Sequence, residues 1–103
     1  MSKFVLHPEA YSDLSEIWEY VAADNHDAAD RLLDEIYASL TLLVRFPKTG
    51  HSRPDLTSRP LRFHVVRDYV IAYPADEKPL AVVAILEGRR NPRVLAAILN
   101  GRS

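Results

Sequence analysis

The chain has 103 residues, of which 48% are hydrophobic, and this size and composition predict one soluble, cytoplasmic domain spanning residues 1–103. It has no cysteine, which excludes a disulfide framework, a thiolate zinc site and a cysteine nucleophile, and it has neither a signal-peptide core nor the ~20 apolar residues of a membrane span. The net charge of −1 is unevenly placed, because four basic and nine acidic residues give −5 over residues 1–50, whereas nine basic and five acidic residues give +4 over residues 51–103.

The first half of the chain is predicted to form two amphipathic helices after a short strand at residues 3–6. Pro8 and Glu9 suit the first turn of a helix with His7 at the cap position, where Ser, Thr or Asp would be better. Apolar side chains then recur at helical spacing: Tyr11, Leu14, Ile17, Trp18, Val21 and Ala22. Asn25 is a good cap for a second helix with its own apolar stripe: Ala29, Leu32, Leu33, Ile36, Leu40 and Leu43.

Only a short break at residues 24–26 joins the two helices, so we expect an antiparallel helical hairpin. Each apolar stripe has to be buried against a further layer of the fold. The acidic side chains are expected on solvated faces. The expected core against a sheet includes Leu14, Ile17, Trp18, Leu33, Ile36 and Leu40.

The second half of the chain has the alternating and β-branched patterns of strands. After a proline-rich loop at residues 47–60, strands are predicted at residues 61–66, 69–73 and 80–86, with a tight turn at Arg67 and Asp68. The last run is apolar throughout, which favours a central strand covered on both faces. Asn91 and Pro92 open a short helix that ends before Gly101. The predicted fold is α+β with the order β-α-α-β-β-β-α: an antiparallel meander, the hairpin on one face, and the first strand at an edge.

The side chains best suited to chemistry or binding lie in the strand region and its turns. They are Arg62, His64, Arg67, Tyr69, Glu87, Arg89 and Arg90. Such residue types can cleave a phosphodiester without a metal, because they supply a base for the 2′-hydroxyl, cations for the phosphate and an acid for the leaving oxygen. Alternatively, Tyr69 belongs to the core and the arginines form a rim that contacts an acidic partner.

Other catalytic sites and cofactor sites are not predicted. The histidines at positions 7, 26, 51 and 64 lack the close spacing of paired metal ligands. The serines lack the setting of a nucleophile elbow, and three glycines are too few for a phosphate loop. We therefore expect no metal and no cofactor.

Four segments, in their order and spacing, resemble the RelE/ParE superfamily of type II toxin–antitoxin toxins, and its ParE-like branch in particular. They are residues 13–22 (DLSEIWEYVA), 25–36 (NHDAADRLLDEI), 46–56 (FPKTGHSRPDL) and 66–73 (VRDYVIAY), the last continued by residues 78–80 (KPL) and 86–90 (LEGRR). The resemblance covers nearly the whole chain. It implies the same element order, a toxin of the plasmid-stabilisation kind, and a hetero-oligomer in which the C-terminal segment of an antitoxin wraps around the toxin.

The resemblance implies two kinds of target. ParE-like toxins bind DNA gyrase and stall it on DNA, whereas RelE-like toxins cleave mRNA on the ribosome. The chain departs from the RelE-like pattern at three positions: Val70 stands where a basic residue is usual, Glu87 replaces a histidine, and Lys48 is the only lysine near the end of the second helix. These departures favour the gyrase-directed branch.

Three functions are therefore considered. A gyrase inhibitor acts by binding, and the residues expected to contact the target or the antitoxin are Arg62, Arg67, Tyr69, Arg89 and Arg90. An mRNA endonuclease would use Arg62, His64, Tyr69, Glu87 and Arg89. The third function is a non-toxic interaction module of the same fold. In every case the arginine-rich half predicts an acidic contacting segment in the antitoxin.

Overall fold

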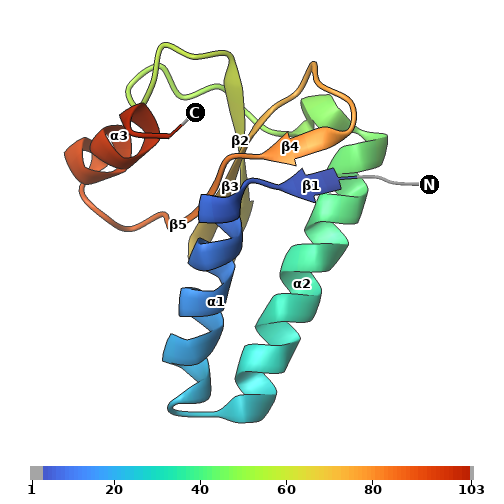
Figure 1. Cartoon of the computed structure of the whole chain (residues 1–103), viewed down its shortest axis with the longest axis vertical. Helices are drawn as coiled ribbons and strands as arrows, with labels where there is room; N and C mark the ends of the chain where they lie inside the picture. Colours follow the sequence, from blue (N-terminus) through green and yellow to red (C-terminus); the bar gives the residue numbers. More distant parts are fainter. Residues whose placement is uncertain (1–3, 103) are drawn as a thin grey trace.

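The computed structural model describes residues 4–102, so the predicted strand start at Lys3 lies outside the described residues. Figure 1 shows a long helical hairpin extending from one side of a small sheet, with a short helix near the C-terminus. The elements are β1 (Phe4–Leu6), α1 (Pro8–Ala22), α2 (His26–Arg45), the 3-10 turn η1 (Pro47–Thr49), β2 (Leu61–Val66), β3 (Tyr69–Pro74), β4 (Leu80–Val82), β5 (Ala84–Glu87) and α3 (Pro92–Asn100). Among residues 4–102, no helix combines the length and apolarity needed to cross a membrane.

Side-chain caps fix the starts of the three helices at the positions predicted from the sequence. The Asn25 side chain accepts a hydrogen bond from the N–H of Ala28 at 3.0 Å, and the Asn91 side chain accepts one from Arg93 at 2.8 Å. His7 also caps its helix, because its Nδ1 atom accepts from the N–H of Glu9 at 3.2 Å. These contacts satisfy backbone donors that the first turn of a helix leaves unpaired.

The predicted meander is confirmed as an antiparallel sheet in the order β2-β3-β5. The single strand expected over residues 80–86 is wrong, since the run divides at Val83 into β4 and β5. The N–H of Val83 donates to the carbonyl of Ala72 on β3 at 2.9 Å. The first strand, predicted at an edge of the meander, instead pairs in parallel with β4 in a separate two-stranded sheet, so that prediction is wrong. The division arises because the two halves of one apolar run pair with different strands.

β3 and β5 are buried on both faces over most of their length, which explains their nearly continuous apolar sequences, whereas β2 at the edge is only partly buried. On one face, Leu14, Ile36 and Leu40 of the hairpin pack with Ile71 and Ile85 of the sheet, as predicted. On the other face, α3 and the loop before β2 pack on the sheet, and the buried side chains include Leu56, Phe63, Ala72, Ala84, Leu95 and Leu99. The sheet is therefore the middle layer between the hairpin and α3.

The predicted apolar stripe of α1 is wrong at one position. Tyr11 is 62% exposed, and Ala10 is buried in its place. Ile17 and Trp18 are half-buried rather than fully enclosed, and the indole N–H of Trp18 donates to Asp30 at 3.0 Å. The hairpin thus keeps exposed aromatic side chains that helical spacing alone assigned to the core.

Candidate functional site

One end of the sheet brings together two turns that are distant in the sequence. Tyr69 begins β3 and pairs with Val66 of β2 on one side and with Glu87 of β5 on the other. The N–H of Gly88 donates to the carbonyl of Asp68 at 2.8 Å, so the turn after β5 lies against the turn between β2 and β3. Five of the seven predicted site residues gather at this end: Arg67, Tyr69, Glu87, Arg89 and Arg90.

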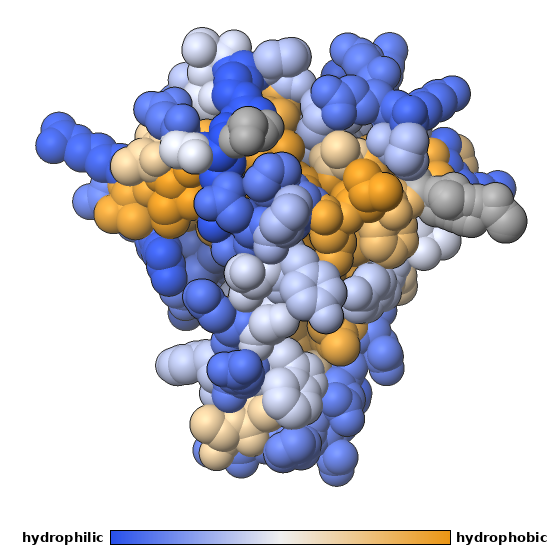
Figure 2. Space-filling view, viewed as in Figure 1, coloured by the Kyte–Doolittle hydropathy of each residue, from blue (hydrophilic) through white to orange (hydrophobic). Residues whose placement is uncertain are grey.

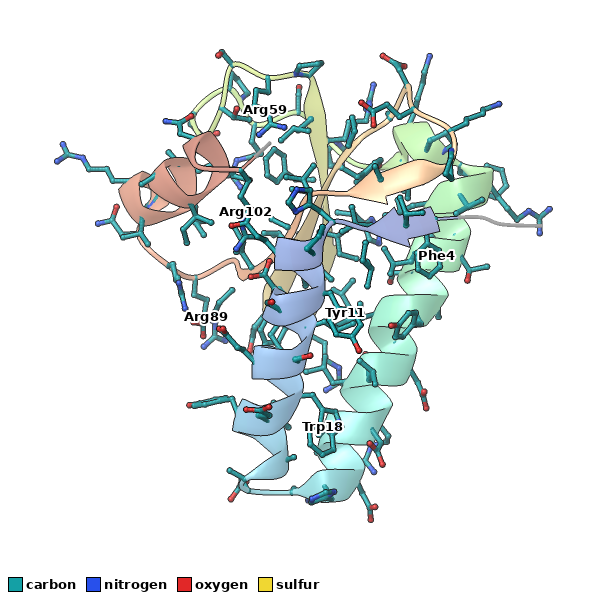
Figure 3. All side chains as sticks on the ribbon, in the orientation of Figure 1. Phe4, Tyr11, Trp18, Arg59, Arg89 and Arg102 are labelled. Carbon is teal, nitrogen blue, oxygen red and sulfur yellow. The ribbon has the colours of Figure 1, made fainter. Side chains whose placement is uncertain are left out.

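Three exposed arginines at this end, Arg67, Arg89 and Arg90, are named here the arginine row. Each arginine is paired with a carboxylate of the same chain. The closest N–O distances are 2.5 Å for Arg67–Glu35, 3.1 Å for Arg89–Asp68 and 3.7 Å for Arg90–Glu87. The row is therefore a surface of alternating charges. Figure 3 shows Arg89 beyond the end of β5.

Arg67 is the most firmly held residue of the row. Its φ is 54°, in the left-handed region that residues with a side chain rarely adopt. From this turn its guanidinium makes two hydrogen bonds to Glu35 of α2, Nε–Oε1 at 2.6 Å and Nη2–Oε2 at 2.5 Å. This forked contact lowers the pKa of Glu35 and raises the pKa of Arg67, because each charge favours the other.

Tyr69 and Glu87 are cross-strand neighbours on the face of the sheet that the hairpin covers. Burial raises the pKa of the Tyr69 hydroxyl, and the negative charges of Glu87 and Asp68 raise it further. The hydroxyl therefore keeps its proton at neutral pH and can donate a hydrogen bond or a proton. The Glu87 side chain is exposed.

Arg62 and His64 lie farther along β2. Arg62 pairs in register with Tyr73, and its guanidinium donates to the carbonyls of Lys48 and Gly50 at 3.2 and 2.6 Å. His64 pairs with Ile71 and is half-buried. Burial lowers the pKa of its imidazole, and the nearby His51 lowers it further, so His64 is neutral at pH 7. The seven predicted residues therefore do not form one cluster.

A groove of about 780 Å³ lies beside the arginine row, between α1, β5 and α3. Tyr69, Glu87 and Arg90 line it from the sheet side. Glu9 and Glu16 line it from α1, so its rim is acidic. Because Tyr69 and Glu87 line this groove, a molecule bound in it would contact both side chains.

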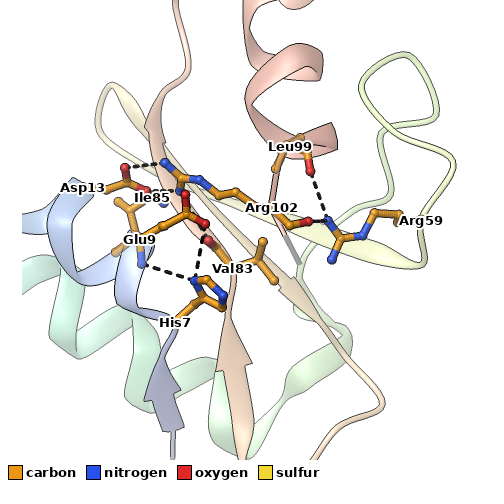
Figure 4. Close-up of polar contacts among 8 residues, drawn as sticks. All are labelled: His7, Glu9, Asp13, Arg59, Val83, Ile85, Leu99 and Arg102. Carbon is orange, nitrogen blue, oxygen red and sulfur yellow. Dashed lines mark hydrogen bonds and ion pairs between the residues drawn. The ribbon is translucent and has the colours of Figure 1, made fainter.

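A largely buried ion pair between Asp13 and Arg102 lies at the edge of β5 next to this groove (Figure 4). Both nitrogens of the Arg102 fork bind Asp13 of α1, Nη1–Oδ2 at 2.5 Å and Nη2–Oδ1 at 2.8 Å. Asp13 also accepts from the N–H of Ile85 at 3.0 Å, and Arg102 donates to the carbonyl of Val83 at 3.3 Å. These side chains satisfy the N–H of Ile85 in β5 and the carbonyl of Val83 just before β5, and they tie Arg102 to α1.

A second arginine holds the same C-terminal end. The Arg59 guanidinium donates to the carbonyls of Leu99 and Arg102 at 3.1 and 2.8 Å, which adds a link from the loop before β2 to the end of α3 (Figure 4). The sequence pattern did not single out Arg59, Asp13 or Arg102. The Asp13–Arg102 contact spans 89 positions, so no local spacing could have identified it.

A smaller groove of about 260 Å³ is lined by side chains of α1 and α2. Tyr11, Trp18, Leu33 and Tyr37 line it, and Figure 3 shows Tyr11 and Trp18 between the two helices. Figure 2 shows that hydrophilic side chains cover most of this side of the molecule, with apolar patches near α3 and near β1 and β4. The groove therefore offers aromatic surface within a largely polar face.

Within residues 4–102, no group of three or more His, Asp or Glu side chains is placed to hold a metal ion. A family model described as ParE toxin of type II toxin-antitoxin system, parDE, matches residues 4–92 of the chain. None of the curated proteins compared with the chain matches it.

Proposed function

The chain belongs to the ParE toxins of type II toxin–antitoxin systems, and from this membership we propose that it binds and inhibits DNA gyrase and that the C-terminal segment of a cognate antitoxin wraps around it. The extent of the match is the observation that carries the proposal. Residues 4–92 include the hairpin, every strand and the whole arginine row. The family itself implies an antitoxin partner.

The arginine row supports an inhibitor that acts by binding. Its three arginines are more than half exposed, with 59% of the Arg67 side chain, 76% of Arg89 and 51% of Arg90 open to solvent. Forked arginine contacts suit recognition of carboxylates on a protein partner. Arg62 has a different role in the fold, because its guanidinium binds loop carbonyls.

One observation favours a second candidate, an mRNA endonuclease. Tyr69 holds its proton next to the carboxylate of Glu87, and Arg90 lies 3.7 Å from that carboxylate. This trio offers an acid, a base and a cation. Arg62 and His64 also belong to the predicted nuclease set, but they lie farther along the sheet, and the guanidinium of Arg62 is held by loop carbonyls. This separation supports the binding mechanism over cleavage.

Induction of the chain in cells without antitoxin tests the proposal. We expect growth arrest, loss of negative supercoiling in a reporter plasmid and no new mRNA 5′ ends in primer extension, with all effects reversed by the antitoxin. New 5′ ends with normal supercoiling would instead establish the endonuclease. Normal growth would assign the chain to the non-toxic interaction modules.

A further inference from the structure

The arginines of the arginine row are already bound to carboxylates of the same chain. Every arginine of the row faces a carboxylate of this chain, and the carboxylate side chains are themselves 43–54% exposed. The single-contact pairs Arg89–Asp68 and Arg90–Glu87 contribute little to stability, because water screens them and two flexible side chains have to be ordered. An anionic partner can therefore replace these two contacts at little cost to the fold, whereas the forked Arg67–Glu35 contact is held more firmly.

The three pairs form one continuous surface. Arg67 and Asp68 are consecutive residues of one turn, and that turn is joined to the next by the Gly88–Asp68 backbone hydrogen bond of 2.8 Å. Glu87 pairs in register with Tyr69, directly after Asp68. Glu35 reaches the same surface from α2. The three arginines of the row therefore lie on two turns that are joined to each other at one end of the sheet.

We propose that Glu35, Asp68 and Glu87 are intramolecular competitors that limit the affinity of the arginine row for an acidic segment of the antitoxin. Such a segment takes over the arginines one by one with its own carboxylates, and the displaced acids turn to solvent. The inference rests on the proposed neutralisation by an antitoxin and is independent of gyrase as the target.

The alternating charges favour a protein segment over nucleic acid. A nucleic-acid duplex carries about one negative charge per 1.7 Å of its axis. Its closely spaced phosphates would therefore be repelled by the carboxylates of Glu35, Asp68 and Glu87. Glu9 and Glu16 on the neighbouring groove add to the repulsion. A peptide with spaced carboxylates can instead exchange with them individually.

Removing one competitor at a time tests the proposal. The affinity of the full-length cognate antitoxin is measured by calorimetry for Asp68→Asn and Glu87→Gln. Each variant is expected to bind about two- to five-fold more tightly than wild type, since an exposed ion pair lost from the free toxin changes affinity by that order. Both substitutions remove exposed charges, so loss of folding is not expected, and thermal unfolding checks this.

The chain offers matched controls in the loop between β3 and β4. Asp76→Asn and Glu77→Gln make the same chemical changes at exposed positions outside the row, and are expected to change the affinity less than two-fold, roughly the effect of net charge alone. A short DNA duplex serves as the second probe. The inference would be overturned if Asp68→Asn and Asp76→Asn bound the antitoxin with equal affinity. It would also be overturned if Asp68→Asn bound the DNA duplex more tightly than wild type but did not bind the antitoxin more tightly. Failure of the antitoxin to bind wild type would overturn the proposed neutralisation itself.

Discussion

Tyr73 and Gly50, 23 positions apart in the sequence, meet where the hydroxyl oxygen of buried Tyr73 accepts the N–H of Gly50 at 2.9 Å. The same hydroxyl donates to the carbonyl of Pro47 at 2.7 Å. The approach is so close that a Cβ atom on Gly50 would lie 2.6 Å from the hydroxyl and 2.9 Å from the carbonyl oxygen of Phe63. One hydroxyl thus fixes the loop after α2 onto the sheet.

Tyr73→Phe should therefore destabilise the fold although it removes a single oxygen atom. The substitution leaves a buried N–H and a carbonyl without their partner, which costs about 1–3 kcal/mol of unfolding free energy. Urea denaturation followed by circular dichroism measures the loss. Tyr20→Phe is the control, because Tyr20 is 80% exposed and should lose almost nothing. Equal stabilities for the two variants would contradict the assigned role of the hydroxyl.

Removal of Arg102 should cost more than removal of any arginine in the row. Arg102 and Asp13 are each only 12% exposed, so Arg102→Gln leaves Asp13 in a largely buried setting. We expect the free energy of unfolding to fall by about 2–4 kcal/mol. This is less than breaking a fully buried ion pair would cost, because the remaining Asp13 carboxylate keeps some contact with water. Arg93→Gln, at an exposed position of α3, is the control. A double-mutant cycle with Asp13→Asn then measures the interaction energy between Asp13 and Arg102. An interaction energy near zero would contradict a stabilising role for this ion pair.

Stability should fall as the pH drops below the ordinary His pKa of 6.5, because the pKa of His64 is lowered in the folded state by burial and by His51. The unfolded chain then binds a proton at a higher pH than the folded chain, so protonation favours unfolding. The loss of stability is absent at pH values above the ordinary His pKa and complete at pH values below the pKa of His64 in the folded chain. Unfolding free energies measured between about pH 7 and about pH 5 should show a decline that His64→Gln reduces. An unchanged decline in that variant would contradict the assignment.

Charge reversal in the arginine row should disable the toxin without unfolding it. Arg89→Glu combined with Arg90→Glu places like charges next to Asp68 and Glu87 and repels an acidic partner surface. We expect about a ten-fold or greater loss of gyrase inhibition, since misplaced like charges at an interface cost several kcal/mol. Arg45→Glu, at an exposed position near the end of α2, is the matched control. Similar inhibition by both variants would remove the row from the binding surface.

The sequence predicted the elements that depend on local signals. The caps at Asn25 and Asn91 and the antiparallel pairing of residues 61–66 with 69–73 all follow from residue types and spacings within a few positions. The division at Val83 could not be predicted, because it depends on parallel pairing between β1 and β4, which are distant in the chain. Tyr11 was misplaced for a related reason, since helical spacing does not reveal which edge of a stripe the partner helix leaves open.

The candidate site was predicted only in part. Tyr69 and Glu87 were both named as candidate site residues, and the sheet register places them side by side. The carboxylate partners of the arginine row were not predicted, because Glu35 binds Arg67 across 32 positions. The alternation of strands puts Arg62 and His64 on one face, yet it cannot show that Arg62 is bound to loop carbonyls. Tertiary contacts therefore decide which charged residues are available to a partner.

The most direct measurement compares two purified reactions that receive the same toxin preparation: supercoiling of relaxed plasmid by DNA gyrase, and translation of a reporter mRNA by ribosomes. The proposed function predicts that supercoiling stops as the toxin is added, that translation continues, and that the antitoxin restores supercoiling. Unchanged supercoiling together with cleaved mRNA and halted translation would contradict it.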